Sequence, residues 1–206
     1  MNYISIIVSV LSILATIASL IYAVYCNKRA KRKERDNQSV KWTDLPVAAQ
    51  DMAKKIKHEF LPEVIYAPSE KSGILIRLLK THWDMFIPSI TGFGMRKDDY
   101  TTSEEAKIIN RDNNYHSFVT SKWRSYIPKQ LFEYKDKKLL IVDDFAKSGD
   151  FIDKLIDVLV QKGFQRSNIK VFCLATHEVA IDNRETVDFY WRKTQSSIYM
   201  PWGKTE

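Results

Sequence analysis

Two adjacent carboxylates, Asp143 and Asp144, end an apolar run and precede a Lys-Ser-Gly turn in LLIVDDFAKSGDF (139–151). Crowding two such charges costs electrostatic free energy unless cations or hydroxyl groups face them. Carboxylates in this place suit sugar hydroxyls, a hydrated Mg²⁺, or positive charge that develops on a ring carbon. The turn suits a phosphate, because Ser148 and the backbone N–H groups around Gly149 open a helix. The stretch therefore predicts a site for a sugar phosphate at the end of a strand.

Other interpretations of the acid pair need less chemistry. The pair could be only a helix-capping turn with a solvated edge. A response-regulator receiver also carries an acid pair after a strand, but near the start of its domain, whereas only 62 residues follow Asp144 here. The histidines have no metal-ligand spacing, and no Cys-His or Ser-His-Asp arrangement can be argued from spacing.

The elements around this stretch alternate between helices and apolar strands. Helical spacing of apolar residues predicts helices over 47–60, 74–83 and 150–164, the last ending at Gly163. Strands are expected within 63–67, 84–94, 115–121, 138–144, 168–177, 188–191 and 196–202, with a turn at 68–73. Residues 97–113 and 120–134 are expected to be loops or connections. This order predicts an α/β domain with a mostly parallel sheet flanked by helices, in which ligands bind beyond the carboxyl ends of strands.

The amino-terminal segment differs from the rest of the chain. Residues 3–25 contain no charge, no Pro and no Gly. A helix rises about 1.5 Å per residue, so this length spans a bilayer core of about 30 Å. Six basic residues follow and favour a cytoplasmic location for this end: Lys28, Arg29, Lys31, Arg32, Lys33 and Arg35. A cleaved signal peptide would want a basic start, a shorter apolar stretch and a small-residue cleavage site, none of which is present.

We therefore expect a transmembrane helix at 1–26, a basic juxtamembrane linker at 27–41 and a domain at 42–206. The protein would be a single-pass inner-membrane protein with a cytoplasmic domain. Its lipid contacts would come from residues 3–25 and the basic stub. The small residues Ser9, Ser12, Ala15 and Ser19 could instead make this helix an oligomerisation face.

The net charge of +7 lies mostly in the first 35 residues, which carry six basic residues and one acid. The other 171 residues keep +2, so direct nucleic-acid binding is not expected. The two cysteines, Cys26 and Cys173, fit a reducing compartment without a disulfide framework.

The acid-pair stretch resembles the signature of the type I phosphoribosyltransferases, which is a strand, two acids, two apolar residues and a Ser/Thr-Gly turn. Residues 42–80 are similar to the first helix, first strand and pyrophosphate loop of that family. Residues 188–203, DFYWRKTQSSIYMPWG, are similar to the base-binding tail of its xanthine-guanine branch. The resemblance implies a type I phosphoribosyltransferase-like fold, and Mg²⁺ as cofactor.

The resemblance also implies roles for individual residues. Asp143 and Asp144 would contact ribose hydroxyls, hold Mg²⁺ directly or through water, and stabilise an oxocarbenium-like transition state. The 5′-phosphate would be bound by Ala146, Lys147, Ser148, Gly149 and Asp150, and the pyrophosphate by Ser69, Lys71, Ser72 and Gly73. Phe189 or Tyr190 would stack on a base, with Trp202 nearby. Segment 120–134 would be a mobile loop whose Lys122, Arg124 and Tyr126 reach pyrophosphate on closure.

The sequence departs from the family pattern at the phosphate-binding positions. Phe151 stands where a hydroxyl is usual, and Asp150 and Glu70 place carboxylates where phosphates would bind, while Lys147 supplies a compensating cation. Two functions remain open. One is a membrane-anchored phosphoribosyltransferase that transfers phosphoribose from phosphoribosyl pyrophosphate to a purine-like base. The alternative is a non-catalytic binding module of a nucleotide or a protein partner, such as a membrane effector of a bacterial antiphage (retron-like toxin) defence system.

Overall fold

The computed structural model describes the backbone of residues 3–37, 39–96, 114–182 and 186–205. Side chains are described over the same ranges except at 3–12, 15, 32–37 and 204. The chain divides into two compact units, residues 1–39 and 40–206. The predicted loop at 97–113 lies outside the described residues.

The first unit is one helix, α1 (Tyr3–Asn37), which continues through the basic residues that follow the apolar stretch. The side chains of much of the predicted transmembrane helix are not among those described. The same holds for three residues of the predicted small-residue face: Ser9, Ser12 and Ala15. Among the residues that the structure describes, none of the helices is both long enough and apolar enough to cross a membrane.

The second unit is built on a five-stranded sheet in which every pairing is parallel. The strands run in the order β2 (Ser89–Thr91), β1 (Val64–Ala67), β6 (Leu139–Ala146), β7 (Ile169–His177) and β8 (Phe189–Thr194). All four residues of β1 are buried, as the apolar run predicted. The expected α/β architecture is confirmed, and Pro88 stands just before an edge strand.

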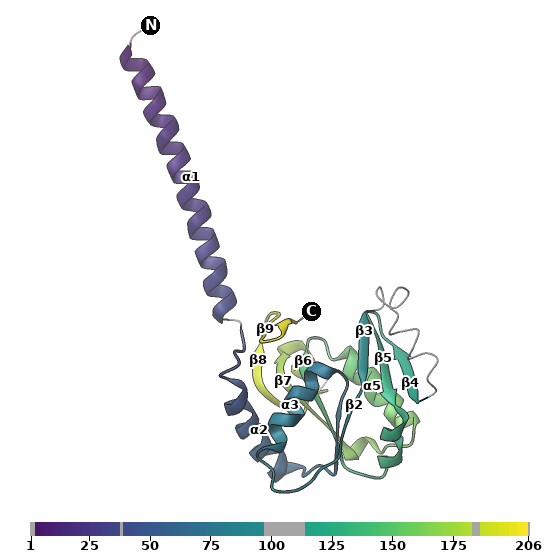
Figure 1. Cartoon of the computed structure of the whole chain (residues 1–206). Coiled ribbons are helices and arrows are strands. Elements are labelled where there is room, and N and C mark those ends of the chain that lie inside the picture. Colours follow the sequence, from purple (N-terminus) through teal and green to yellow (C-terminus); the bar gives the residue numbers. More distant parts are fainter. Residues whose placement is uncertain (1–2, 38, 97–113, 183–185, 206) are drawn as a thin grey trace. The chain divides into compact units, whose positions relative to one another are not determined.

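Helices cover both faces of this sheet (Figure 1). Helices α2 (Leu45–Glu59) and α3 (Glu70–Lys80) pack one face, where Met52, Ile56 and Leu75 meet Leu140 and Val142 of β6. Helix α5 (Asp150–Gln161) packs the other face through its apolar stripe and ends just before Gly163, whose φ of 101° suits glycine. The described part of this unit also contains three short helices, η1 (Lys129–Tyr134), η2 (Arg166–Asn168) and α6 (Glu178–Asp182).

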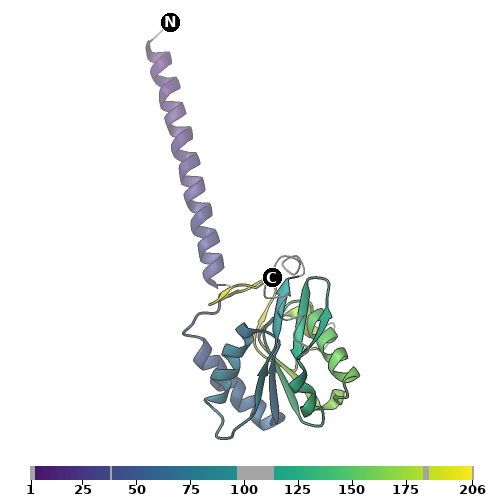
Figure 2. The same cartoon turned by 45° about the vertical axis from the view of Figure 1, so that its right-hand side comes forward.

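A second sheet of three antiparallel strands, called the hood here, contains β3 (Phe93–Arg96), β5 (Trp123–Pro128) and β4 (Tyr115–Val119) in that order. It is visible beside α5 in Figure 2. The segment 120–134 was expected to be a loop, and this assignment is wrong: it contains β5, the central hood strand, and η1. The many polar residues of this segment favoured a loop in the sequence, whereas three residues of β5 are buried: Ser125, Tyr126 and Ile127.

The predicted strand at 84–94 is two strands, and Gly92 separates them. The N–H of Gly92 donates to the carbonyl of Ala67 over 2.7 Å, which ends the run along β1. A Cβ at Gly92 would come within 2.2 Å of the Tyr66 hydroxyl oxygen. Only glycine lets the chain pass this close as it leaves the sheet for the hood.

Two further segments differ from expectation or complete it. The predicted turn at 68–73 is mostly the first turn of α3, because Ser69 caps the helix by accepting from the Ser72 N–H over 3.3 Å. The carboxyl-terminal residues form a small hairpin of β9 (Tyr199–Met200) and β10 (Gly203–Lys204).

Candidate functional site

The acid pair lies in the last half of β6, the central strand of the parallel sheet. Asp143 is bonded to Ser72 of α3, whereas Asp144 is bonded to Trp202 near the end of the chain. Asp143 is 8% exposed, whereas Asp144 is half-buried. The carboxylates that looked alike in sequence therefore have different surroundings.

Asp143 is hydrogen-bonded to the start of α3. Its Oδ1 accepts from the Ser72 hydroxyl over 2.7 Å and from the Asp144 N–H over 3.0 Å. The Ser72 hydroxyl also lies 2.8 Å from the Ser69 hydroxyl. Ser72 is fully buried, so this chain of polar groups is inside the protein. The segment predicted to bind pyrophosphate is thus attached directly to the acid pair.

Burial and, second to it, the charge of Asp144 raise the pKa of Asp143 to about 7, although two hydrogen bonds act to lower it. Burial and the Asp143 charge also raise the pKa values of two other groups, Tyr66 and Cys173. Cys173 is opposite Asp143 in the register of β6 and β7. The interior beside Asp143 is therefore a region in which negative charge is unfavourable.

Asp144 faces two groups from distant parts of the chain. Its Oδ2 accepts from the Trp202 indole N–H over 2.7 Å. Burial raises the pKa of Asp144, and the Trp202 hydrogen bond and the Lys71 charge act in the opposite direction. Trp202 belongs to the Pro-Trp segment, which was expected near a base. Its hydrogen bond to a carboxylate was missed, because sequence spacing does not report a contact across 58 residues.

The turn between β6 and α5, which the sequence predicted to bind a phosphate, contains a glycine in the left-handed conformation. Gly149 has φ of 84°, a left-handed conformation that favours glycine, and it caps α5. The Ser148 hydroxyl, however, donates to the Asp150 carboxylate over 2.7 Å. The side chain expected to bind a phosphate oxygen is thus bonded to a carboxylate two residues away, while Lys147 and Asp150 are both exposed.

Phe151 occupies the position where a phosphate-binding hydroxyl is usual. Its ring packs against Phe118 of the hood, with ring centroids 5.8 Å apart and planes 31° from parallel. Phe118 is buried, so the pair joins α5 to the hood. The missing hydroxyl is replaced by a packing contact between two parts of the domain.

The structure does not bring all predicted residues together in the same way. Phe189 is 3% exposed and belongs to the core, which leaves half-buried Tyr190 as the remaining candidate for base stacking. Arg124 and Tyr126 belong to β5 of the hood, and Lys122 lies in the turn between β4 and β5. Lys122 is exposed, Arg124 is half-buried, and Tyr126 is 1% exposed. A buried tyrosine cannot contact a ligand without repacking of the hood.

Asp143 and Asp144 fit a Mg²⁺ site of the kind that is completed by a ligand. Magnesium is commonly bound by one or two carboxylates together with waters and substrate phosphates. The Oδ1 of Asp143 already accepts two hydrogen bonds, so the Oδ2 of Asp143 would be its ligand to the ion. Within the described residues, no group of three or more His, Cys, Asp or Glu side chains could hold a metal alone.

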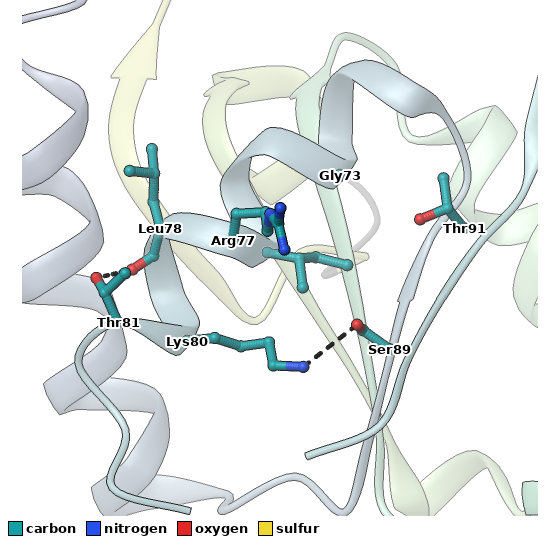
Figure 3. Close-up of a pocket in the computed structure, with 8 residues that line it drawn as sticks. Gly73, Arg77, Leu78, Lys80, Thr81, Ser89 and Thr91 are labelled. Atoms are coloured by element: carbon teal, nitrogen blue, oxygen red, sulfur yellow. Dashed lines mark hydrogen bonds between the residues drawn. The ribbon is translucent and has the colours of Figure 1, made fainter. Parts of the chain in front are cut away.

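A surface pocket of about 650 Å³ lies between α3 and β2 (Figure 3). It is lined by Gly73, Ile76, Arg77, Leu78, Lys80, Thr81, Ser89 and Thr91. Lys80 extends from α3 toward β2, where its Nζ donates to the Ile87 carbonyl over 2.7 Å and lies 3.4 Å from the Ser89 hydroxyl. Neither acid nor the α5 turn lines this pocket, so the pocket adjoins the Ser69–Gly73 segment without being the acid-pair site.

No family model and no curated protein matches the sequence. Solved structures do match the fold. A purine phosphoribosyltransferase from Pyrococcus horikoshii is 21% identical, with a TM-score of 0.58 over 82% of this chain and 95% of that chain. A hypoxanthine-guanine phosphoribosyltransferase from Bacillus anthracis is 14% identical, with a TM-score of 0.53 over 80% of this chain and 86% of that chain.

A hypothetical protein from Neisseria gonorrhoeae with bound ppGpp is also similar. It is 14% identical, with a TM-score of 0.52 over 80% of this chain and 87% of that chain. Identities this low show the fold alone. The α/β domain with its parallel central sheet has the fold of the phosphoribosyltransferases.

Proposed function

We propose that the domain binds phosphoribosyl pyrophosphate, or a related nucleotide, with the ribose over the acid pair. The carrying observation is the 2.7 Å hydrogen bond from Ser72 to Asp143. It joins the segment after β1 to the carboxyl end of β6, and the α5 turn begins at the same edge of the sheet. Ligands of open parallel sheets bind at this edge.

In this proposal the chain supplies charge and orientation instead of a covalent nucleophile. The carboxylates of Asp143 and Asp144 accept from ribose hydroxyls and stabilise positive charge on the ribosyl ring as pyrophosphate leaves. Backbone N–H groups of 147–149 receive the 5′-phosphate, and Lys71 offsets the charge of the pyrophosphate. Mg²⁺, when bound between the acids and the ligand, would neutralise the phosphate oxygens. A purine-like base would then accept the phosphoribosyl group.

The second candidate is a binding module of the same fold without turnover. Two contacts favour it: Ser148 is bonded to Asp150, and Phe151 is packed on Phe118. A carboxylate in the cradle repels a phosphate dianion. In this candidate the ligand acts as a signal, and the module passes that signal to a protein partner, for example within a bacterial defence system.

The function test is calorimetric titration of phosphoribosyl pyrophosphate with Mg²⁺ into the full chain in mild detergent. Asp144→Asn is the site variant, and Asp51→Asn on the exposed side of α2 is the matched charge control. Binding that is lost only in Asp144→Asn supports the proposal, and release of pyrophosphate with purine bases then identifies the acceptor. Equal binding by both variants contradicts a role for the acid pair. No binding by any of the three rejects this ligand.

We also propose that residues 3–25 anchor the chain in the inner membrane with the domain in the cytoplasm. The support is the uncharged stretch followed by six basic residues. Extraction of cell membranes with alkaline carbonate should leave the chain in the pellet, and replacing Ile13, Ile17 and Ile21 with Asp should release it. Wild-type protein in the carbonate supernatant would reject the anchor.

A further inference from the structure

The carboxyl-terminal hairpin places a tryptophan against the acid pair. The Trp202 indole N–H donates to Asp144 Oδ2 over 2.7 Å in a partly buried contact. A hydrogen bond to a carboxylate is strong and directional, so it restricts rotation of the carboxyl group. Trp202 thereby fixes the direction in which Asp144 presents its other oxygen.

The hairpin that carries Trp202 is closed by a buried threonine. The Thr205 hydroxyl donates to the Ile198 carbonyl over 2.8 Å and accepts from the Ile198 N–H over 3.0 Å. The Thr205 N–H donates to the same carbonyl over 3.0 Å. Thr205 is 8% exposed and Ile198 is 1% exposed, so the base of the hairpin is anchored in the protein interior. The hydrogen bonds of the hairpin therefore fix the position of the Trp202 backbone.

A second support comes from the segment that continues the chain after α1. The Val40 N–H donates to the Tyr199 carbonyl at the start of the hairpin over 2.7 Å. The Trp42 ring meets the Trp202 ring edge to face, with centroids 6.0 Å apart and planes 70° from parallel. Such an arrangement is favourable for two aromatic rings. Residues 40–42 therefore hold the same tryptophan that holds Asp144.

We propose that Trp202 is a positioning residue for Asp144, and that Trp42 couples the segment after α1 to this carboxylate through it. The proposal rests on the proposed function in one respect, namely that Asp144 contacts the ligand. Energetic coupling between two places is reciprocal. A change in the attachment of residues 40–42 alters ligand affinity at Asp144, and a ligand at Asp144 alters the surroundings of Trp42.

The binding arm of the test compares variants of the full chain in detergent, titrated with Mg²⁺ and phosphoribosyl pyrophosphate. Trp202→Phe keeps a ring but removes the N–H donor. Trp42→Ala alters a residue that is 59% exposed, so folding is preserved. Trp191→Phe is the matched control, because Trp191 packs on the same core as Trp202, whereas the hydrogen bond to Asp144 comes from Trp202. We expect affinity about tenfold lower for Trp202→Phe, a few-fold lower for Trp42→Ala, and unchanged for the control.

The second arm needs no ligand. The chain has five tryptophans, and 5-fluorotryptophan labelling gives one fluorine signal for each. Asp144→Ala should move the signals of Trp202 and of Trp42, which is one contact further away. It should leave the signal of Trp83, whose N–H donates to the Ala53 carbonyl over 2.9 Å, in place. A structural role for Trp202 alone would not move the Trp42 signal.

Each outcome decides one of the two proposals. Wild-type affinity in Trp202→Phe, or an unmoved Trp42 signal in Asp144→Ala, overturns the positioning and coupling proposal. If the wild-type chain does not bind phosphoribosyl pyrophosphate, the proposed function fails. The fluorine arm still decides the coupling in that case.

Discussion

Replacing Asp143 with Asn should stabilise the folded protein at neutral pH while it removes a group of the proposed site. Asp143 has an ordinary pKa of 3.8, and burial and the Asp144 charge raise it to about 7 in the folded state. For an acid with a raised pKa, the folded protein binds more protons than the unfolded chain between these values. The free energy of unfolding therefore falls as the pH rises from about 4 to about 8.

The magnitude follows from the size of the shift. A difference of about three pKa units corresponds to ~4 kcal/mol at most, since each unit is worth ~1.4 kcal/mol. Asn can still accept from the Ser72 hydroxyl and the Asp144 N–H, but its amide group then needs an acceptor of its own, which returns part of the gain. We expect Asp143→Asn to raise the free energy of unfolding by ~2 kcal/mol at pH 8, and to change it little at pH 4.

Urea unfolding of the full chain, followed by tryptophan fluorescence, measures this directly. All five tryptophans lie between positions 42 and 202, so the signal reports on the domain and not on α1. Asp51→Asn, an exposed carboxylate on α2, is the control for loss of one negative charge. If Asp143→Asn is no more stable than wild type at pH 8, or shows the same slope of stability with pH, Asp143 does not carry the buried charge inferred here.

Four further substitutions test the packing and the phosphate turn. Asp150→Asn should strengthen binding of phosphoribosyl pyrophosphate about tenfold in calorimetry, because it removes the carboxylate that accepts from Ser148 and repels a dianion; unchanged affinity would place the phosphate elsewhere. Gly92→Ala should lower the free energy of unfolding by ~3 kcal/mol in urea, since its Cβ would lie 2.2 Å from the Tyr66 hydroxyl oxygen. Gly94→Ala, with its nearest atom at 4.0 Å, should cost less than half as much. Tyr66→Phe should raise the unfolding temperature, because the Tyr66 hydroxyl is buried with no hydrogen-bond partner in the described part of the chain.

The parallel sheet was predictable because its strands are buried on both faces and read as apolar runs. The strands β6 and β7 can be predicted from their own apolar residues, in LLIVDD and IKVFCLAT, without reference to distant residues. The hood was not predictable in this way. Trp123–Pro128 mixes basic, aromatic and hydroxyl side chains, and only its pairing with both β3 and β4 makes it the centre of a sheet. Such pairing is a long-range property that local propensity does not report.

The candidate site shows the same division between local and distant information. The acid pair and the turn at Gly149 lie within one short stretch, so residue types and spacing were enough to select them. The contact between the start of α3 and the acid pair could be expected only from a family resemblance. The hydrogen bond from Ser72 to Asp143 joins residues 71 positions apart, and residue types and spacing do not report it. Ser69 appeared to belong to a turn, yet it is a helix cap whose hydroxyl also meets Ser72.

The two acids differ in the proposed site because different parts of the chain hold them. Asp143 is hydrogen-bonded to Ser72 in an interior where a negative charge is unfavourable. A cation or the hydroxyl groups of a ligand would therefore stabilise the charged form of Asp143. Asp144 is half-buried and held by Trp202, and through Trp42 it is connected to the segment that follows α1. A single contact with each acid would therefore report on two different parts of the protein: the Ser69–Gly73 segment through Asp143, and the amino-terminal attachment through Asp144. This asymmetry connects a ligand at the acid pair to residues 40–42 of the domain, whether or not the ligand is turned over.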